Sequence, residues 1–503
     1  QYCTTMHLLN SLKSMPYLLP VFSALLGIFA MPPLQISTLL LVIYVPMYLF
    51  AVSRTKVWQG FVGGLIYGVF FAGVVAHAVM SGFNWLPEAT LFIAYMKMLG
   101  WVIVLINGLV GGVVFASITY IALRTKNHML LAIFSVLILL AYEYIIVLAA
   151  FGYHYGSLGY IATEFERLRI FAEYGGSYAV ATFVILINIL VAEVVRAMRT
   201  GTFTFVAQLA LVCVFMQIAA YSLQAPLAPQ VGHVRVAVIQ EQSRGLDAFG
   251  VVENGVFSFP SLEAHVQDAL IEKPDILIYP IAPWSGVLSD EVDNTRFDRE
   301  VIVISDAMLS AWLKKHVTPD VVFVFWYTTY RDGDYLNEMT FWQDGEQIEG
   351  YQKRKIFPFF DYVPEWAQSL GMYSLPYDGT AGTDASPSVV GDARVGSLVC
   401  SEVVDRKTAQ ENSQTANMLF AIGSEALFSH KLPSEYNNLN AQLRAAELGL
   451  PVVRANRSGP SAVFDADGSV IASMPYGVSG VFVAEVPVYD GRHKTFYEQF
   501  ILQ

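Results

Sequence analysis

Cysteine and charge are both scarce in this sequence. Three cysteines stand among 503 residues, at Cys3, Cys213 and Cys400. They are too few and too widely spaced for a disulfide framework or a cysteine-rich zinc site. Charged residues make up 14% of the chain, whereas apolar residues make up 55%. This composition excludes a disordered chain and is unusual for a soluble globular protein.

The few charges are divided unevenly along the chain. Residues 1–223 contain 10 Lys or Arg and 6 Asp or Glu, a net charge of +4, and residues 224–503 contain 20 and 36, a net charge of −16. The two sums give the −12 of the whole chain. We therefore expect a membrane domain over residues 1–223 and a second domain over 224–503. The acidic second domain disfavours a nucleic-acid partner.

Long apolar runs fill the first domain. A helix needs about 20 residues to cross a hydrocarbon core about 30 Å thick. We expect seven such spans, at about residues 15–31, 34–52, 58–81, 93–123, 128–150, 177–196 and 203–223. They show no pair of interrupted helices of the kind that builds transport sites, which disfavours a transporter. Glu143 stands in the middle of a span, where a carboxylate faces either the protein interior or a proton or substrate path.

Basic residues occur in every second loop of the first domain. They are Lys13, Arg54, Lys56, Arg124, Lys126, Arg196 and Arg199. Loops that are rich in Lys and Arg are typical of the cytoplasmic side of a membrane. With an odd number of spans, the second domain then lies outside. For a Gram-negative bacterium this predicts an inner-membrane protein with a periplasmic domain.

Short runs rich in β-branched residues alternate with helical stretches in the second domain. The predicted strands are 234–240, 275–279, 321–326, 394–399, 418–422, 451–454 and 460–464, and the predicted helices are 261–272, 301–315 and 435–449. This alternation predicts sheets covered by helices. We expect an α-β-β-α sandwich, although the periodicity also fits another α/β layering.

The second domain contains one thiol, which is a candidate nucleophile. Cys400 ends the apolar run GSLVC, and a cysteine at the end of a buried strand meets the cleft at the sheet edge. Lys353 lies in the segment Tyr351–Pro364, and an ammonium group near a thiol favours the thiolate and stabilises an oxyanion. From the residues alone, an inert buried thiol and a solvated lysine stay open as alternatives.

Six segments together carry a resemblance to a known family. They are Leu26–Pro33, Ser157–Tyr160, Ala172–Tyr178, Tyr351–Pro364, Cys400–Glu402 and Arg444–Asn456. In this order and spacing they resemble the apolipoprotein N-acyltransferase family, which is the membrane-bound branch of the nitrilase, or carbon-nitrogen hydrolase, superfamily. The expected fold is then a multi-span helical domain followed by a nitrilase-like α-β-β-α sandwich. We expect neither a metal nor a cofactor.

The resemblance implies a two-step acyl transfer. Cys400 would attack the acyl ester of a membrane phospholipid, form a thioester and release a lysophospholipid. The N-terminal amine of a diacylglyceryl-cysteine lipoprotein would then take the acyl chain. Lys353 matches the catalytic lysine of the family. Glu402 and Asp361 match its supporting acids, with Asp361 where Glu is usual, and Tyr351 is expected to support the site beside the lysine.

One position departs sharply from the family pattern. The general base of the family is a Glu directly after an aromatic-Pro pair, whereas Tyr279-Pro280 is followed here by Ile281. Isoleucine cannot accept a proton, and loss of a positioned base typically costs about 10²–10⁴ in rate. Either Asp290, Glu291 or Glu402 substitutes for it, or acyl transfer is weakened or lost. In the second case the chain is a diverged member, for example a conjugation- or plasmid-associated one, that binds lipid or lipoprotein.

Further departures are milder. Leu427 stands where the family favours Trp, and Ser401 stands where an aromatic residue is common. The last transmembrane span of the family has no counterpart after the second domain. This fits either a truncated chain or a member that lacks the span.

The alternating basic loops make the orientation testable. We predict that a cysteine introduced near residue 300 reacts from outside with a membrane-impermeant thiol reagent in intact spheroplasts. Protection of this cysteine until the cells are lysed would contradict the predicted orientation.

Overall fold

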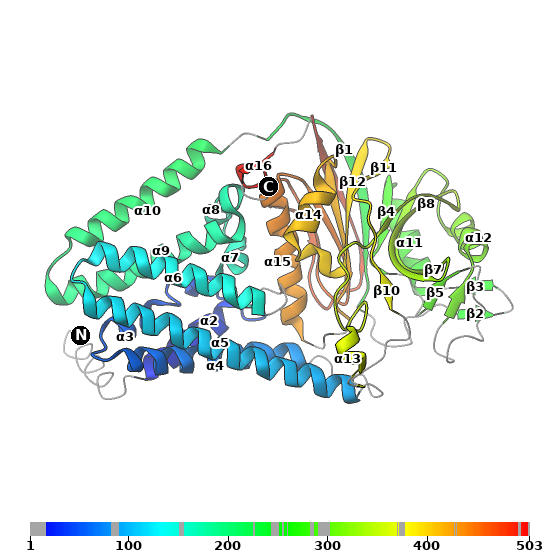
Figure 1. Cartoon of the computed structure of the whole chain (residues 1–503). Helices are drawn as coiled ribbons and strands as arrows, with labels where there is room; N and C mark the ends of the chain where they lie inside the picture. The colour runs from blue at the N-terminus through cyan, green and yellow to red at the C-terminus, as the bar shows by residue number, and fades with distance from the viewer. Residues whose placement is uncertain are drawn as a thin grey trace. The chain divides into compact units, whose positions relative to one another are not determined.

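The computed structural model describes most of the chain. The described residues are 17–81, 90–149, 155–224, 227–242, 251–253, 256–258, 260–281, 286–289, 302–369, 371, 378–426, 428, 430–490 and 494–500. Two compact units divide the chain, one from Gln1 to Gln224 and one from Ala225 to Gln503. The first is helical and the second is built on two large sheets (Figure 1).

Helices make up the described part of the first unit. They are α2 (Leu18–Ala30), η1 (Ser37–Leu41), α3 (Val45–Val52), α4 (Val57–Met80), α5 (Thr90–Arg124), α6 (His128–Ala149), α7 (Leu158–Ile161), η3 (Ala162–Glu164), α8 (Glu166–Arg169), α9 (Ala172–Thr200) and α10 (Thr204–Leu223). Five of them, α4, α5, α6, α9 and α10, are long and apolar enough to cross a membrane. This confirms the multi-span helical domain, with five long spans among the described residues where the sequence predicted seven.

The two remaining predicted spans form shorter helices. The run 34–52 divides into η1 and α3, with Pro46 in the first turn of α3. Proline has no N–H and its ring clashes with the preceding turn, so one helix cannot continue through this position. The run 15–31 contains α2, which is 13 residues long. Hydropathy alone did not reveal these interruptions, because it averages over a window and ignores the backbone.

Asn188 on α9 bridges the interruption between η1 and α3. Its Oδ1 accepts the N–H of Tyr44 at 2.8 Å, and its Nδ2 donates to the carbonyl of Leu40 at 2.7 Å. Both backbone groups are left over by the broken helix and are buried. Since an unpaired backbone group is costly inside a membrane, this side chain makes the interruption tolerable.

Glycines let α4 and α5 approach closely. A Cβ added at Gly64 would lie 2.1 Å from the carbonyl oxygen of Gly111, and one at Gly68 would lie 2.5 Å from that of Asn107. Both distances are far below van der Waals contact. The spacing of these glycines, four residues apart on one helix face, is typical of tight packing between membrane helices.

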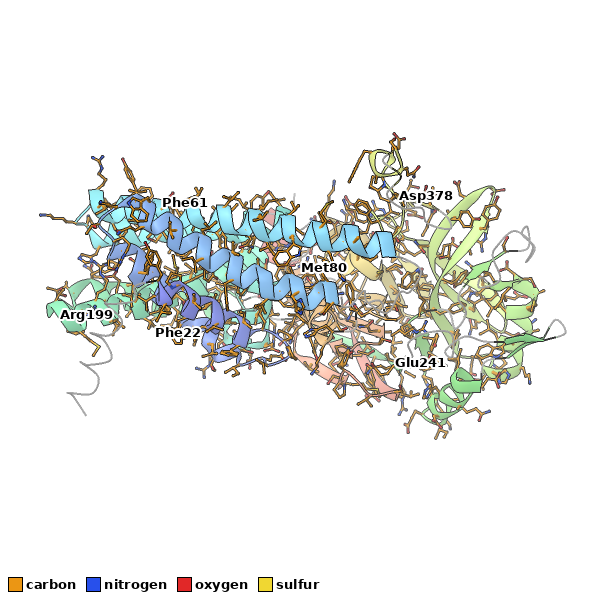
Figure 2. All side chains as sticks on the ribbon, turned by 90° about the horizontal axis from the view of Figure 1, so that it is seen from below. Phe22, Phe61, Met80, Arg199, Glu241 and Asp378 are labelled. Atoms are coloured by element: carbon orange, nitrogen blue, oxygen red, sulfur yellow. The ribbon has the colours of Figure 1, made fainter. Side chains whose placement is uncertain are left out.

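Buried carboxylates tie other parts of the helical unit together. Glu143 on α6 accepts the hydroxyl of Tyr44 at 3.0 Å and the N–H of Leu158 at 3.1 Å, so it faces the protein interior. Glu193 on α9 contacts His128 at the start of α6 and Arg196. The start of α6 and the end of α9 therefore share one end of the unit. Figure 2 shows Phe61 and Arg199 toward this end and Met80 toward the other.

The second unit contains a nine-stranded and a six-stranded sheet. The first is formed by β1 (Gln230–Gln240), β4 (Ile276–Tyr279), β5 (Gly286–Leu288), β6 (Ile302–Ile304), β7 (Val322–Arg331), β8 (Asp334–Gln343), β9 (Glu346–Gln352), β10 (Gly379–Thr380) and β17 (Gly480–Tyr489). The second is formed by β11 (Ser388–Val390), β12 (Ala393–Val399), β13 (Met418–Ser424), β14 (Val452–Arg457), β15 (Ser461–Phe464) and β16 (Val470–Met474). A separate hairpin joins β2 (Val251–Glu253) to β3 (Val256–Ser258).

Helices cover the outer faces of the two sheets. They are α11 (Pro260–Ile271) and α12 (Asp306–His316) on the nine-stranded sheet, and α14 (Arg406–Ser413) and α15 (Lys431–Leu448) on the six-stranded sheet (Figure 1). One apolar core fills the space between the sheets, and another lies under α11 and α12. This confirms the predicted α-β-β-α sandwich. The helix predicted over 301–315 begins later, because residues 302–304 form β6 and Ser305 caps α12 by accepting the N–H of Met308.

The Asn188 bridge can be tested by stability. We predict that Asn188→Leu destabilises the helical unit by about 1–3 kcal/mol, because two buried backbone groups lose their partner. Thr182→Val on the same helix is a matched control, since Thr182 bonds only to Tyr178 of its own helix in the described structure. Thermal unfolding in detergent measures both variants. Equal shifts of the midpoint would show that Asn188 has no special role.

Candidate functional site

The carboxyl ends of three parallel strands, β12, β13 and β14, lie side by side in the six-stranded sheet. In the register, Val399 of β12 pairs with Ile422 of β13, and Ile422 pairs with Ala455 of β14. Cys400 is therefore the first residue beyond β12. Its φ is +55°, in the left-handed region that residues with a Cβ seldom adopt, and it begins the short helix η5 (Cys400–Val403). Such strained residues often occur at functional sites.

Glu402 binds two segments of the chain together. Its Oε1 accepts the Tyr351 hydroxyl at 2.9 Å and the backbone N–H groups of Arg354 and Lys355 at 2.8 and 2.9 Å. Its Oε2 accepts the N–H of Val399 at 2.8 Å. Burial raises the pKa of the Glu402 carboxyl, and the Lys353 charge opposes the shift together with the hydrogen bonds from Lys355, Val399 and Tyr351. The end of β9 is thereby fixed to the end of β12.

Lys353 follows β9 and forms a buried ion pair. Its side chain is 1% exposed, and Nζ lies 2.6 Å from Oδ2 of Asp361. Burial by itself would lower the pKa of Lys353, but the Asp361 carboxylate raises it above the usual lysine value, with help from Cys400. Asp361 also accepts Nδ2 of Asn337 at 2.9 Å and the N–H of Phe357 at 2.6 Å. The lysine is therefore held charged and in place.

The surroundings of Cys400 disfavour its thiolate form. Burial raises its pKa to about 11, the Lys353 ammonium opposes this shift, and the Asp361 and Glu425 carboxylates reinforce it. An ordinary cysteine has a pKa of about 8.5. A proton acceptor is therefore needed before the sulfur can act as a nucleophile near neutral pH.

The structure brings the predicted site residues together through their partners. Cys400, Lys353, Asp361, Glu402 and Tyr351 are linked by the hydrogen bonds and charge interactions described above. Burial, followed by the Glu402 charge, raises the pKa of the Tyr351 phenol, so Tyr351 stays neutral and donates to Glu402.

Two asparagines belong to this network and were missed in the sequence. Asn412 on α14 donates to the Tyr351 hydroxyl and to the carbonyl of Ser397, both at 2.7 Å. Asn337 on β8 holds Asp361. No sequence motif pointed to either residue, because the residues that each one contacts lie far from it along the chain.

The position where the resemblance expects the general base lies shortly after a strand and carries no carboxylate. Ile281 stands two residues after the end of β4, beyond Pro280, and is half-buried. Of the residues suggested as substitutes, Glu402 is occupied by the donors described above, and Asp290 and Glu291 lie outside the described residues, as does Leu427. A buried carboxylate does lie beside β4: Glu241 accepts the hydroxyl of Tyr279.

Glu425 is a further carboxylate of the site that the sequence analysis did not single out. It follows β13, is 3% exposed, and its Oε1 accepts Nη2 of Arg454 at 2.6 Å and Nδ2 of Asn437 at 2.8 Å. Burial raises the pKa of the Glu425 carboxyl, and the charge of Arg454 lowers it in part. The sequence offered one signal for it. Glu425 comes shortly after a predicted strand, and that strand is the next one along the chain after the strand that ends at Cys400.

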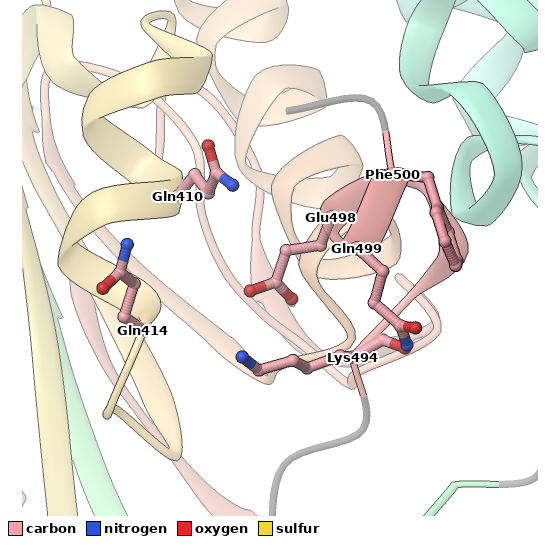
Figure 3. A pocket seen from close by; sticks show the side chains of 6 residues that line it. All are labelled: Gln410, Gln414, Lys494, Glu498, Gln499 and Phe500. Carbon is pink, nitrogen blue, oxygen red and sulfur yellow. The ribbon is translucent and has the colours of Figure 1, made fainter. Parts of the chain in front are cut away.

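A separate pocket lies near the end of the described chain. It has a volume of about 690 Å³ and is lined by Gln410, Gln414, Lys494, Glu498, Gln499 and Phe500. Figure 3 shows Gln410 of α14 and Gln414, which directly follows this helix, on one side and residues of the C-terminal segment, which includes α16 (Phe496–Phe500), on the other. None of the predicted site residues lines this pocket. Among the described residues, no group of three or more His, Cys, Asp or Glu could hold a metal ion.

Comparisons with known proteins match both units. The family model of the apolipoprotein N-acyltransferase N-terminal domain matches residues 23–190, and that of carbon-nitrogen hydrolases matches residues 295–492. Similar curated proteins include the apolipoprotein N-acyltransferases of Rhizobium meliloti, 26% identical over 52% of this chain and 49% of the relative, and of Haemophilus ducreyi, 29% identical over 30% of each chain. The matched part of this chain therefore spans about half of the length of these relatives or less.

A solved structure also shows similarity. The glutamine-dependent NAD⁺ synthetase of Acinetobacter baumannii, solved in complex with ADP, aligns at a TM-score of 0.38 with 15% identity. The alignment covers 53% of this chain and 49% of that chain.

The Lys353–Asp361 pair makes a prediction about stability and pH. In Asp361→Asn the buried ammonium loses its counter-charge, which should cost about 3–5 kcal/mol near neutral pH. Burial then lowers the pKa of Lys353, so the folded state binds fewer protons than the unfolded state. The free energy of unfolding of the variant should therefore rise with pH toward the ordinary lysine pKa of about 10.4.

The parent protein should show the opposite dependence. Its Lys353 pKa is raised, so the contribution of the pair is complete below the ordinary lysine value and is lost as pH rises through the raised pKa. Glu411→Gln, which removes the partly exposed pair between Glu411 and Arg354, is a control that should cost less than about 1 kcal/mol. Thermal unfolding measured at several pH values gives these slopes, and parallel slopes for parent and Asp361→Asn would refute the assignment.

Proposed function

Because this chain belongs to the apolipoprotein N-acyltransferase family within the carbon-nitrogen hydrolase superfamily, we propose that it N-acylates lipoproteins through a thioester on Cys400. The acyl donor is a membrane phospholipid, and the acceptor is the N-terminal amine of a diacylglyceryl-cysteine lipoprotein. One observation carries the proposal. Cys400 has a strained backbone, and the charge of the buried Lys353 acts on its thiol and lowers the thiol pKa in part.

In the first step the sulfur of Cys400 forms a bond to the acyl carbon of the phospholipid. The thiol gives its proton to a base, a tetrahedral oxyanion forms, and the bond from the acyl carbon to the glycerol oxygen then breaks. That oxygen takes up the proton that the thiol lost, and lysophospholipid departs. The Lys353 ammonium stabilises the oxyanion, since a preorganised charge in a buried site acts strongly on developing negative charge. Asp361 keeps this lysine charged and oriented.

In the second step the lipoprotein amine attacks the thioester. The bond between carbon and nitrogen forms, the bond between carbon and sulfur breaks, and the amine gives up a proton as the Cys400 thiol is restored. This division into two easier steps is the usual benefit of a covalent intermediate. Glu402 contributes by positioning, because it fixes the backbone on both sides of the reacting residues.

The chain is a membrane protein with five helices of spanning length among its described residues. We place it in the bacterial inner membrane, with the sandwich unit on the periplasmic side. The alternating basic loops support this orientation. Both substrates carry long acyl chains, which matches an enzyme that is anchored in a bilayer.

A second candidate function is lipid or lipoprotein binding with weakened or lost acyl transfer. The observation that favours it is Ile281 at the position where the resemblance expects the general base. The two candidates differ in one measurable respect, because only the first forms a covalent acyl-enzyme.

Mass spectrometry of the intact protein distinguishes the two. We predict that purified full-length chain, incubated with phosphatidylethanolamine in detergent, gains the mass of one acyl chain, and that hydroxylamine removes it. Cys400→Ala should form no adduct, because the attacking sulfur is absent. Cys213→Ala is the matched control and should acylate normally, since Cys213 is buried within helix α10. A synthetic diacylglyceryl-cysteine peptide should then discharge the adduct.

Adduct formation in Cys400→Ala would overturn the assignment of the nucleophile. A well-folded parent protein that forms no adduct would instead favour the binding function.

A further inference from the structure

Three carboxylates act on the reacting groups of the site: Asp361, Glu402 and Glu425. Both oxygens of Asp361 are occupied by donors, Asn337 on one side and Lys353 with Phe357 on the other. Both oxygens of Glu402 are occupied too, Oε1 by three donors and Oε2 by the N–H of Val399. A proton could reach either group only by displacing such a bond.

Glu425 differs from the other two. Its Oε1 is held by Arg454 and Asn437, whereas its buried Oε2 accepts no hydrogen bond of normal geometry from the described residues. The Asn456 side chain also interacts with this carboxylate and lowers its pKa in part. A buried carboxylate oxygen that lacks a well-formed hydrogen bond is costly unless it takes up a proton or exchanges one. Among the six oxygens of these three carboxylates, it is the least occupied by donors in the described part of the chain.

The strand register places Glu425 beside the thiol. Gly423 of β13 lies level with Cys400, and a Cβ at Gly423 would lie 3.8 Å from the Cα of Cys400. The guanidinium of Arg454 lies on the same glycine, with Nη2 at 3.6 Å from that Cβ position. Arg454 in turn holds Glu425 at 2.6 Å. Cys400 and Arg454, which holds Glu425, therefore both lie close to Gly423.

We propose that Glu425 is the group that accepts the proton of the Cys400 thiol, in place of the carboxylate missing at Ile281. The inference rests on the proposed function. The bond between sulfur and hydrogen breaks, the proton goes to Oε2 of Glu425, and the electron pair on sulfur forms the bond to the acyl carbon. When the glycerol oxygen leaves, it takes this proton, and Glu425 returns to its ionised form.

The charges around the thiol favour this transfer. Near Cys400 lie Lys353, Asp361, Glu402, Glu425 and Arg454, with the neutral Tyr351 and the amide of Asn456 at the edges of the group. The Glu425 carboxylate raises the pKa of the thiol. Once Glu425 is protonated, that repulsion is gone, and the thiolate keeps the attraction of Lys353. The thiol and the Glu425 carboxylate therefore titrate as a coupled pair, in which the carboxylate can hold the proton that the sulfur loses.

Glu241 is the natural competitor for the role. Strands β1 and β4 are parallel, with Val238 level with Ile278, so Glu241 falls level with Ile281 when the register is continued. Its carboxylate, however, already accepts the Tyr279 hydroxyl. Glu241 is labelled in Figure 2 and provides a matched variant, because it is a buried glutamate at the end of a neighbouring strand.

The first test compares acylation rates by phosphatidylethanolamine. Glu425→Gln should acylate Cys400 about 10²–10⁴-fold more slowly than the parent, the usual loss when a general base is removed. The amide oxygen can still accept from Arg454 and Asn437, so the fold should survive, and Glu425→Asp provides a second variant that keeps a carboxylate. Glu241→Gln should leave the rate within about threefold of the parent.

A rescue variant separates proton transfer from a structural role. Adding Ile281→Glu to Glu425→Gln supplies a carboxylate at the other position. The double variant should acylate Cys400 at least about tenfold faster than Glu425→Gln alone. A merely structural defect would not be repaired in this way. A large loss in Glu241→Gln, with none in Glu425→Gln, would overturn the proposal.

A third readout does not depend on acyl transfer. Alkylation of Cys400 by iodoacetamide in the parent should persist as the pH falls below about 8, because Glu425 can hold the proton while sulfur reacts. In Glu425→Gln the alkylation rate should fall about tenfold per pH unit over the same range. Identical profiles would refute the role of Glu425. Failure of the proposed function would leave these alkylation profiles distinct while no acyl adduct forms.

Discussion

The four hydrogen bonds accepted by Glu402 are the constraint on which the site depends. The donors come from both sides of Lys353, through Tyr351 and Arg354, and from the residue before Cys400. Each reacting residue is therefore flanked by backbone or side-chain groups tied to the same buried carboxylate. Glu402 therefore fixes the end of β9 in one sheet to the end of β12 in the other, which holds the backbone around the lysine and the thiol in place.

Electrostatic balance follows from that constraint. Lys353 is kept charged by Asp361, and the thiol interacts with this cation and with the carboxylates of Asp361 and Glu425. The cation alone does not ionise the sulfur, whose pKa remains about 11 because burial outweighs it. A thiol in these surroundings needs a base to accept its proton before the sulfur can attack an acyl group. The Oε2 atom of Glu425 and the pair that Glu425 forms with Arg454 fit that requirement.

The sequence predicted the layers of the sandwich and the principal site residues, for different reasons. Strands such as β12 and β13 are almost wholly buried, and most of their residues are apolar, as expected for parallel strands covered on both faces. Cys400, Lys353, Asp361 and Glu402 were found through their resemblance to a family. Glu425 and Asn412 were not found. Their contacts arise from the strand register and from burial, which produce no recognisable motif in the sequence. Likewise Pro46 and Asn188 interrupt and repair a helix that hydropathy treats as one span.

The most direct measurement of the whole account is the single-turnover acylation rate of the parent protein across pH. With phospholipid in excess and rapid quenching, intact-mass analysis follows the acyl group on Cys400 from about pH 5 to about pH 10. The account predicts a rate that levels off near neutrality, because a carboxylate takes the proton from the thiol. A rate that climbs tenfold per unit up to about pH 10 would mean that only the free thiolate reacts. This result would contradict the account.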